Sequence, residues 1–441
     1  MRVSFLLRTA LIGRAVASPT ADYLQTRQLS LVNNLLNDVL SQITGQVGEL
    51  NSAVNALFSQ LDDVVPTATP TSIEDVVSIV KEVTAATPTA LIENVVKLAA
   101  NSLAPQSFRN LFETYSTGVN SENNVNPDPP QAIYPSKAAG DAVYTVSEAK
   151  LRAAIHIPST FTYGQKQPVI LVPGTGTKGG FVYGGNLAKL LPQEDFADPV
   201  WLNIPGFLLD DVHVNSEYSA YAINYISSIT SRNVSVVGWS QGNLNTQWAL
   251  TFWPSTREVV TDSIAVSPDY HGLVLAYLLC PKLGHLPCAP SVHQQKWDSE
   301  LIQTFRNAGG ASAWAPTTVV WSATDDIVQP NHGTNASSFL QDTRNVGVTN
   351  VELQLACPLL SDCATLYALL KDALTHDGPA SIQRISDFNT ACSKIAADGL
   401  SVQDIIATTV SVPVAVAGVL LYDQKVVNEP AIASYAQSFA P

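Results

Sequence analysis

Apolar positions divide the chain into two regions with different spacing. From Leu29 to Val65 they recur at intervals of three and four, which predicts an amphipathic helix or a helix pair. The proline-bearing stretch 66–70 interrupts this pattern, and Thr71-Ser72-Ile73-Glu74 has the form of a capping box that opens another helix. Pro88 separates that helix from a third one around Leu91 to Leu98. We therefore expect a helical N-terminal extension that packs on itself or on the main domain.

Short β-rich runs alternate with helical stretches in the rest of the chain. The polar residues Asn120 to Pro130 come first and indicate a linker or surface loop. The predicted strands that follow are Pro168 to Val172, Val234 to Val237, Ser263 to Val266, Thr317 to Ser322 and Val348 to Ala356. Such alternation predicts an α/β fold with a mainly parallel sheet and helices on both faces.

The N-terminus has some features of an export signal. Arg2 precedes a short apolar run, and Ala15-Val16-Ala17 resembles a small-residue cleavage site, although further arginines interrupt the apolar stretch. We predict a possible signal peptide over residues 1–17, the helical extension over 18–125 and a catalytic domain over 126–441.

Composition agrees with a folded, exported protein. Of 441 residues, 46% are apolar and 14% charged, which favours a large core over general disorder. A net charge of −14 argues against a nucleic-acid partner. The longest apolar run, Val410 to Tyr422, is shorter than the ~20 residues that span a bilayer, so no transmembrane segment is predicted. We expect a secreted monomer, with glycosylation acceptors at Asn233 and Asn335, of which Asn335 lies farther from a core strand.

Five cysteines allow two disulfides and leave one thiol over. Cys280 and Cys288 enclose a short loop that a disulfide could close, and Cys357 and Cys392 flank the segment after the last predicted strand. The remaining Cys363 is the odd one.

The clearest chemical motif is Gly-Trp-Ser-Gln-Gly at residues 238–242. It follows the strand Val234 to Val237 and precedes a helical stretch from Asn243 to Phe252. A strand, Gly-x-Ser-x-Gly and a helix in this order form a nucleophile elbow, which would hold Ser240 above the sheet and direct the N–H of Gln241 toward an oxyanion. The string alone also occurs by chance, but its context favours the catalytic interpretation.

A serine nucleophile needs a base, and the base needs an orienting acid. The strand that ends near Thr324 leads into Asp325-Asp326, so Asp325 is the predicted acid and Asp326 a solvated carboxylate. The strand that ends at Val172 leads into Pro173-Gly174-Thr175-Gly176-Thr177, which would place the backbone N–H and hydroxyl of Thr175 near the elbow as the second oxyanion donor.

Nucleotide and metal sites are the competing interpretations. Gly174, Gly176 and Gly179 match the spacing of a dinucleotide fingerprint, but the residues after them are a poor helix start and no P-loop lysine follows. His285 and His293 lie near the first cysteine pair without the spacing of zinc ligands. We therefore predict no cofactor and no metal.

A resemblance adds to these motifs. From Pro168 to Cys392 the chain resembles the lipases related to Candida antarctica lipase B, which are secreted fungal α/β-hydrolases. The matching segments are Pro168 to Thr177, Gly238 to Gly242, Trp248 to Phe252, Ser267 to Tyr270, Ala289 to Val292, Arg306 to Gly310 and Ser322 to Pro330. The helical N-terminal region looks like that of longer filamentous-fungal members.

The resemblance implies roles for individual residues. Ser240 would be the nucleophile, Asp325 the acid, and Thr175 and Gln241 the oxyanion donors. Cys357 and Cys392 would form the family's disulfide, and no metal or cofactor would be needed. The acyl and alcohol pockets would be lined by Trp239, Asp269, Gln294, Ile327 and Val328.

The base is where the chain departs from the family. Similar lipases carry Asp-His-Ala after the last strand, whereas this chain has Asp362-Cys363-Ala364, and the stretch before Tyr367 is shorter. Only His332 and His376 follow the predicted acid, and His332 is too close behind it to reach back easily. His376 has the correct chain order and is our predicted base. Two alternatives stay open, namely a histidine-bearing segment missing from the sequence and a genuine loss of the base.

These inferences predict a secreted serine hydrolase of carboxylic esters, a triacylglycerol lipase that acts through an acyl-enzyme on Ser240 at a lipid–water interface. The alternatives are a broad-specificity carboxylesterase or transacylase, and a non-catalytic hydrolase-fold protein that binds a lipid or a partner.

Overall fold

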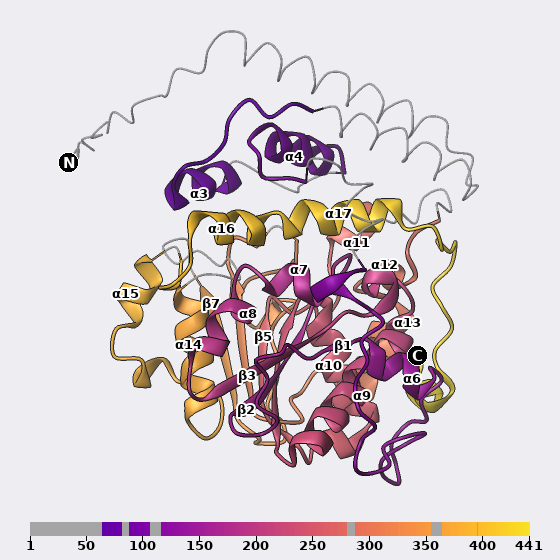
Figure 1. The fold of residues 1–441 in the computed structure, drawn as a ribbon. Coiled ribbons are helices and arrows are strands. Elements are labelled where there is room, and N and C mark those ends of the chain that lie inside the picture. Colours follow the sequence, from indigo (N-terminus) through magenta and orange to yellow (C-terminus); the bar gives the residue numbers. More distant parts are fainter. Residues whose placement is uncertain are drawn as a thin grey trace, which may run out of the picture.

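A seven-stranded sheet forms the centre of the protein (Figure 1). The computed structural model describes residues 64–81, 88–105, 116–279, 287–325, 327–353, 364–394 and 396–441. The strand order is β1-β3-β2-β4-β5-β6-β7, and every neighbouring pair is parallel except β1 with β3. The strands are β1 (Ile155–His156), β2 (Gln167–Val172), β3 (Ala197–Leu202), β4 (Val234–Trp239), β5 (Val260–Val266), β6 (Thr317–Ser322) and β7 (Val348–Leu353). The predicted α/β-hydrolase fold is confirmed.

Alternating side chains bury both faces of the sheet. On β2, Ile170 and Val172 pack in the same cluster as α9 (Val212–Thr230), α10 (Gln241–Phe252) and α13 (Glu300–Asn307). Val169 and Leu171 pack on the other face with α7 (Gly179–Tyr183), α8 (Leu187–Leu190) and α14 (Ala364–Thr375). Because both faces are covered, the strands consist of nearly continuous apolar runs.

Sequence analysis missed β1 and β3. All six residues of β3 are buried, but the strand contains Asp198 and Pro199, which interrupt the apolar pattern expected of a buried strand. The Asp198 carboxylate accepts hydrogen bonds from the backbone N–H and the hydroxyl of Thr162, at 2.6 and 2.7 Å. β1 pairs only with Trp201 and Leu202, so β3 is an edge strand at Pro199, where a missing N–H is tolerated.

A layer of helices lies over the carboxyl edge of the sheet. α16 (Val402–Thr409) and α17 (Ser411–Leu421) form its lower part, and α3 (Ile73–Lys81) and α4 (Pro88–Ala100) lie above them (Figure 1). α3 contacts α16 and α4 contacts α17, with a shared buried cluster of Val76, Leu98, Leu103 and Ile405. The described part of the extension thus packs on the main domain. Most of Leu29 to Val65 lies outside the described residues, and the domain boundary at 125/126 stays a prediction.

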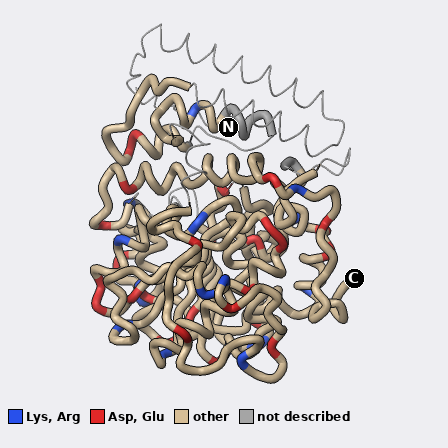
Figure 2. The backbone as a smooth tube through the Cα atoms, turned by 45° about the vertical axis from the view of Figure 1, so that its right-hand side comes forward, with Lys and Arg blue, Asp and Glu red and all other residues tan. Residues whose placement is uncertain are grey.

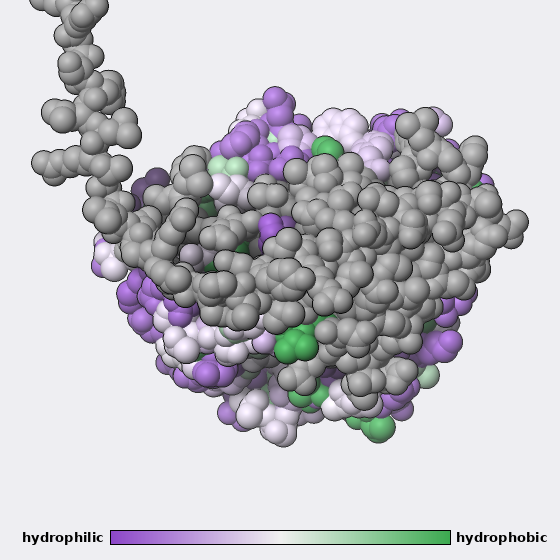
Figure 3. Space-filling view, turned by 90° about the horizontal axis from the view of Figure 1, so that it is seen from above, coloured by the Kyte–Doolittle hydropathy of each residue, from purple (hydrophilic) through white to green (hydrophobic). Residues whose placement is uncertain are grey.

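The lower helices of this layer are strongly apolar. Across the described chain, the stretch Val402–Leu421 is long and apolar enough to cross a membrane, and 56% of its most apolar 18 residues are buried in the fold. Its charge is limited to Asp404, and Figure 2 shows few charged residues along it. Seen from above, the described surface around this face is mainly hydrophilic, with isolated hydrophobic side chains (Figure 3).

The capping box of α3 lies one residue later than predicted. The Ser72 hydroxyl accepts the N–H of Asp75 at 3.1 Å, and the Asp75 carboxylate accepts the N–H of Ser72 at 3.1 Å. The pair is therefore Ser72 and Asp75 instead of Thr71 and Glu74, because α3 begins at Ile73 and Ser72 is the residue before it.

The polar stretch 120–130 is fastened to the domain. The Asn124 amide donates to the carbonyls of Ser121 and Ala153, and the Asn126 amide donates to those of Arg152 and Ile155. Two of these carbonyls, those of Arg152 and Ala153, lie at the end of α6 (Glu148–Ala153), where a helix needs partners for its last carbonyls. The stretch is a surface segment, as one of the two predictions had it, and its polarity serves a structural purpose.

Gly176 sets the distance between the loop after β2 and α17. Its φ is +75°, and a Cβ there would lie 2.4 Å from the carbonyl oxygen of Ala415. Gly378 has a similar φ of +77° but open space around it, so it provides a matched control.

We predict that Gly176→Ala destabilises the protein by roughly 2–4 kcal/mol, since it adds a clash to the backbone strain. Gly378→Ala should cost about 1 kcal/mol, from strain alone. Urea unfolding of both variants measures the difference. Equal losses would show that the contact with α17 does not constrain the loop.

Candidate active site

Ser240 sits on a tight turn between β4 and α10. Its backbone is strained, with φ 51° and ψ −127°, a region that non-glycine residues rarely adopt. The turn is possible because a Cβ at Gly242 would lie 2.5 Å from the carbonyl oxygens of Val172 and Pro173. The N–H of Ser240 donates to Val266 at 2.9 Å, which ties the turn to β5. The strand–turn–helix geometry predicted around Ser240 is present.

Thr175 and Gln241 lie side by side at this turn. The Thr175 hydroxyl is 2.7 Å from Gln241 Oε1 and 3.1 Å from Gln295 Oε1, and its single proton can serve one of these acceptors at a time. Within the described ranges, neither the backbone N–H of Thr175 nor that of Gln241 has a hydrogen-bond partner. Two unpaired N–H groups flanking a serine are the donors that an oxyanion requires.

Asp325 follows β6 at the same edge of the sheet as Ser240. Its Oδ1 accepts the N–H groups of Ile327 and Val328, both at 2.9 Å, which fixes the carboxylate in the turn. Only β5 separates β4 from β6, so the two strand ends are about 10 Å apart. That gap suits an intervening imidazole.

An apolar cluster stands beside this edge. Ile327 packs there against residues of α11 (Leu275–Leu279), α12 (Pro290–Gln294) and α17, namely Leu275, Ala276, Val292 and Val419. Val328 is buried, and Trp239 is half-buried next to Gly174, whose Cβ position would lie 2.9 Å from the Trp239 ring. The wall is suited to an alkyl chain.

Asp269 is a buried acid just beyond β5. Among the described residues neither of its carboxyl oxygens has a hydrogen-bond partner, and the side chain is fully buried. Burial raises the pKa of Asp269 to about 7, because an ionised carboxylate is poorly solvated there. Below that pH the group is a neutral acid with one O–H to donate.

Comparison with known proteins places this arrangement in a family. The chain is 34% identical over 316 residues to Lipase B of Pseudozyma antarctica, a match that covers 69% of this chain and 89% of that lipase. The chain belongs to the lipase B family. The fold matches the crystal structure of Aspergillus fumigatus lipase B with a TM-score of 0.79 and 42% identity, over 93% of this chain and 99% of that one. No model of a protein family matches the chain.

As a member of this family, the chain is a carboxylic ester hydrolase. Across the residues that the structure describes, no group of three or more His, Cys, Asp or Glu is placed to hold a metal ion.

The structure corrects the prediction for Gln294. Its amide accepts the N–H of Val212 and donates to Asp211, both at 2.7 Å, so the fully buried side chain caps the start of α9. Gln295, the next residue, contacts the site instead, since its Nε2 donates to Gln241 Oε1 at 3.0 Å. Adjacent helical residues point about 100° apart. Which of Gln294 and Gln295 faces the site therefore depends on the orientation of α12.

The structure also corrects the prediction for His376. Its Nδ1 lies 3.3 Å from the Asp372 carboxylate, and the loop after it docks on the amino end of β6, where Ala380 N–H donates to the Thr318 hydroxyl at 2.8 Å. α14 rises about 18 Å along its 12 residues and carries the chain from the carboxyl edge to the amino edge. His376 therefore lies at the opposite edge from Ser240 and Asp325.

The other described histidines are engaged elsewhere. His332 is 71% exposed and pairs with Glu352 at 3.3 Å. His213 lies 2.6 Å from Asp211, but its ring packs on Trp248, two turns along α10 from Ser240. In the described ranges no histidine hydrogen-bonds Ser240. Residues 354–363, which contain Cys363, lie outside them and include no histidine in the sequence.

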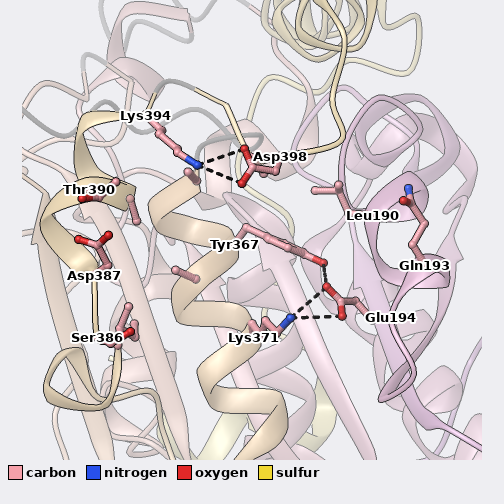
Figure 4. Close-up of a pocket in the computed structure, with 15 residues that line it drawn as sticks. Leu190, Gln193, Glu194, Tyr367, Lys371, Ser386, Asp387, Thr390, Lys394 and Asp398 are labelled. Carbon is pink, nitrogen blue, oxygen red and sulfur yellow. Dashed lines mark hydrogen bonds and ion pairs between the residues drawn. The ribbon is translucent and has the colours of Figure 1, made fainter.

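A pocket of about 470 Å³ opens away from these residues. Figure 4 shows it between η2 (Leu191–Gln193) and the helices α14 and α15 (Phe388–Ser393). At its floor the Tyr367 hydroxyl donates to Glu194 at 2.7 Å, and Lys371 lies 3.3 Å from the same carboxylate. None of the proposed catalytic or oxyanion groups lines it.

The described residues include two of the five cysteines and both predicted glycosylation acceptors. Cys288 and Cys392 are each part of a disulfide bond, and the other three cysteines, Cys280, Cys357 and Cys363, lie outside the described residues. Asn233 and Asn335 are both exposed.

We predict that Asp269→Asn makes stability less dependent on pH. A carboxyl whose folded pKa is raised stabilises the fold while protonated, and this contribution is lost as pH rises from about 4 to about 7. The loss is roughly 2–4 kcal/mol, and the neutral amide avoids it. In urea unfolding at pH 5 and pH 8, the free energy of unfolding of the variant should rise relative to that of the parent at pH 8. A parallel pH trend in both proteins would contradict a buried neutral Asp269.

We predict that His376→Ala changes ester hydrolysis by less than about twofold, because its imidazole lies at the far edge of the sheet. His332→Ala is a matched control on the same substrate, p-nitrophenyl butyrate. A loss of tenfold or more in His376→Ala alone would restore His376 as the base.

Proposed function

We propose that Ser240 hydrolyses carboxylic esters, triacylglycerols above all, through an acyl-enzyme. The observation that carries this is the strained turn that presents Ser240 beside two unpaired N–H groups, those of Thr175 and Gln241. With a base in place, Ser240 Oγ attacks the acyl carbonyl and gives its proton to that base, while the oxyanion accepts hydrogen bonds from the two N–H groups. The base returns the proton to the leaving alcohol, and it then takes a proton from the water that releases the fatty acid from Ser240.

The Thr175 hydroxyl supplies a third donor when it rotates. In the free enzyme its proton points to a glutamine oxygen, either Gln241 Oε1 or Gln295 Oε1. An oxyanion is a stronger acceptor than an amide oxygen, so substrate would draw the hydroxyl toward itself only as negative charge develops.

The apolar cluster around Ile327 supports long acyl chains as substrates. Its residues come from α11, α12 and α17, so three elements far apart in sequence build one wall. Secretion, a monomeric state, disulfides 280–288 and 357–392, glycosylation at Asn335 or Asn233 and action at a lipid–water interface belong to the same proposal, supported by the sequence signals and by lipase homologues.

The base belongs at the sequence position directly before α14. That helix begins at Ala364 and runs away from the carboxyl edge, so its start lies at the edge that carries Ser240 and Asp325. The chain has Asp362-Cys363-Ala364 there, where similar lipases have Asp-His-Ala. Because His376 is no longer a candidate for the base, two alternatives remain: a histidine-bearing segment is missing from the sequence, or the base is lost. Sequencing the transcript between the codons for Cys357 and Tyr367 decides between them.

If the chain is confirmed as it stands, we predict that Cys363→His raises turnover by about 10²- to 10⁴-fold, because removal of a triad member leaves only oxyanion and binding contributions. Cys363→Ala is the control, since it removes the thiol without adding a base. No gain in Cys363→His relative to Cys363→Ala would show that imidazole at this position cannot reach Ser240.

Ser240→Ala tests the nucleophile. We expect p-nitrophenyl ester hydrolysis to fall by several orders of magnitude and covalent labelling by a fluorophosphonate to disappear, since both need the hydroxyl. Unchanged hydrolysis in Ser240→Ala would refute the acyl-enzyme.

Cys363 also motivates a second candidate function, a non-catalytic hydrolase-fold protein that binds a lipid in the apolar cleft. A thiol cannot replace an imidazole oriented by Asp325, and the remaining acceleration would be only ~10³-fold over water. Failure of the parent protein to react with fluorophosphonate, together with binding of a fatty acid, would favour this second function.

A further inference from the structure

Lys178 ends the loop that carries Thr175, and its side chain is fully buried. An ammonium group in a protein interior costs several kcal/mol unless it is paired and hydrogen-bonded. A buried lysine so close to the oxyanion donors therefore requires an explanation in terms of its partners.

Three groups surround the ammonium. Nζ forms an ion pair with Glu122 Oε1, donates to the Ser116 hydroxyl at 2.6 Å and lies 4.8 Å from the centre of the Phe207 ring. Burial lowers the pKa of Lys178, and the Glu122 carboxylate opposes that shift. Glu122 thus favours the charged form of Lys178.

Phe207 connects this ion pair to the loop itself. Its carbonyl oxygen accepts the N–H of Gly176 at 2.8 Å, while its ring covers the Lys178 ammonium. The Phe207 backbone adopts φ 58° and ψ 34°, a left-handed conformation that lets carbonyl and ring contact the same loop. Thr175 is therefore held between two braced neighbours, Gly176 and Lys178.

Glu122 is itself rigidly placed. The carbonyl oxygen of Val119 accepts the indole N–H of Trp201 at 2.7 Å and the amide of Asn203 at 2.9 Å. The amide oxygen of Asn203 accepts the N–H of Gly180 at 3.2 Å, at the start of α7. The segment that carries Glu122 is thus hydrogen-bonded to the end of β3 and, through Asn203, to α7. These bonds fix the position of the Glu122 carboxylate.

We propose that Glu122 is a positioning residue for ester hydrolysis, because its ion pair with Lys178 holds the 174–178 loop with Thr175 beside Ser240. The proposal rests on the proposed function, in which Thr175 is an oxyanion donor. It gives a catalytic purpose to a segment that precedes the predicted catalytic domain.

Glu122→Gln tests the pair, because it keeps the shape and removes the charge. We expect kcat, normalised to sites titrated with fluorophosphonate, to fall about 10- to 100-fold, as small displacements of reacting groups do. KM for p-nitrophenyl butyrate should stay within about twofold, since the oxyanion contact is made in the transition state. Asp398→Asn, which removes the carboxylate of the exposed Lys394–Asp398 pair, should leave both constants unchanged.

A double variant separates positioning from folding. Glu122→Leu with Lys178→Met replaces the pair by apolar side chains, and such replacements often preserve stability. We expect it to recover the melting temperature of the parent without recovering kcat. Recovery of kcat as well would overturn the proposal, and so would an unchanged kcat in Glu122→Gln while Ser240→Ala is inactive. Activity in Ser240→Ala would instead refute the proposed function. The effect of Glu122→Gln would then still be read from its kcat and KM relative to those of the parent protein.

Discussion

The close approach of β2 and β4 at their carboxyl ends is the constraint on which the site depends. Gly242 leaves no room for a side chain against the carbonyls of Val172 and Pro173, and a Cβ at Gly174 would lie 2.9 Å from the Trp239 ring. This approach forces Ser240 into its strained backbone conformation and brings Thr175 next to Gln241. The energy stored in the turn is offset by the surrounding sheet, since both faces of β2 and β4 are buried.

Around that turn the protein leaves several polar groups without partners in the described structure. The N–H groups of Thr175 and Gln241 are unpaired, and so are the Gln241 Nε2 and both oxygens of Asp269. Unsatisfied buried polar groups are rare in folded proteins because each costs about 1–3 kcal/mol. Beside Ser240, unpaired N–H groups are available to a negative charge that develops during a reaction.

The loop between β2 and α7 is braced from every side. α17 presses on Gly176, Phe207 holds its N–H, and Glu122 reaches Lys178 from a segment more than fifty residues earlier. The same helix α17 also contacts α4, so the N-terminal extension and the loop that carries Thr175 pack against one helix. The apolar character of α16 and α17 follows from this position between two layers.

Local sequence determined a large part of this protein. The five predicted strands, the turn at Ser240, the position of Asp325 after β6 and the glycine-bearing loop after β2 follow from apolar periodicity and turn chemistry over a few residues. Strand β3 was not predicted from the sequence, because a buried aspartate and an edge proline are tolerated only through neighbours that are distant in the chain. The choice of Gln295 over Gln294 depended on the orientation of a short helix. His376 satisfied the chain order of a triad, yet the direction of α14 carried it to the opposite edge. Chain order and composition are local properties, whereas the distance between side chains is decided only when helices pack on the sheet.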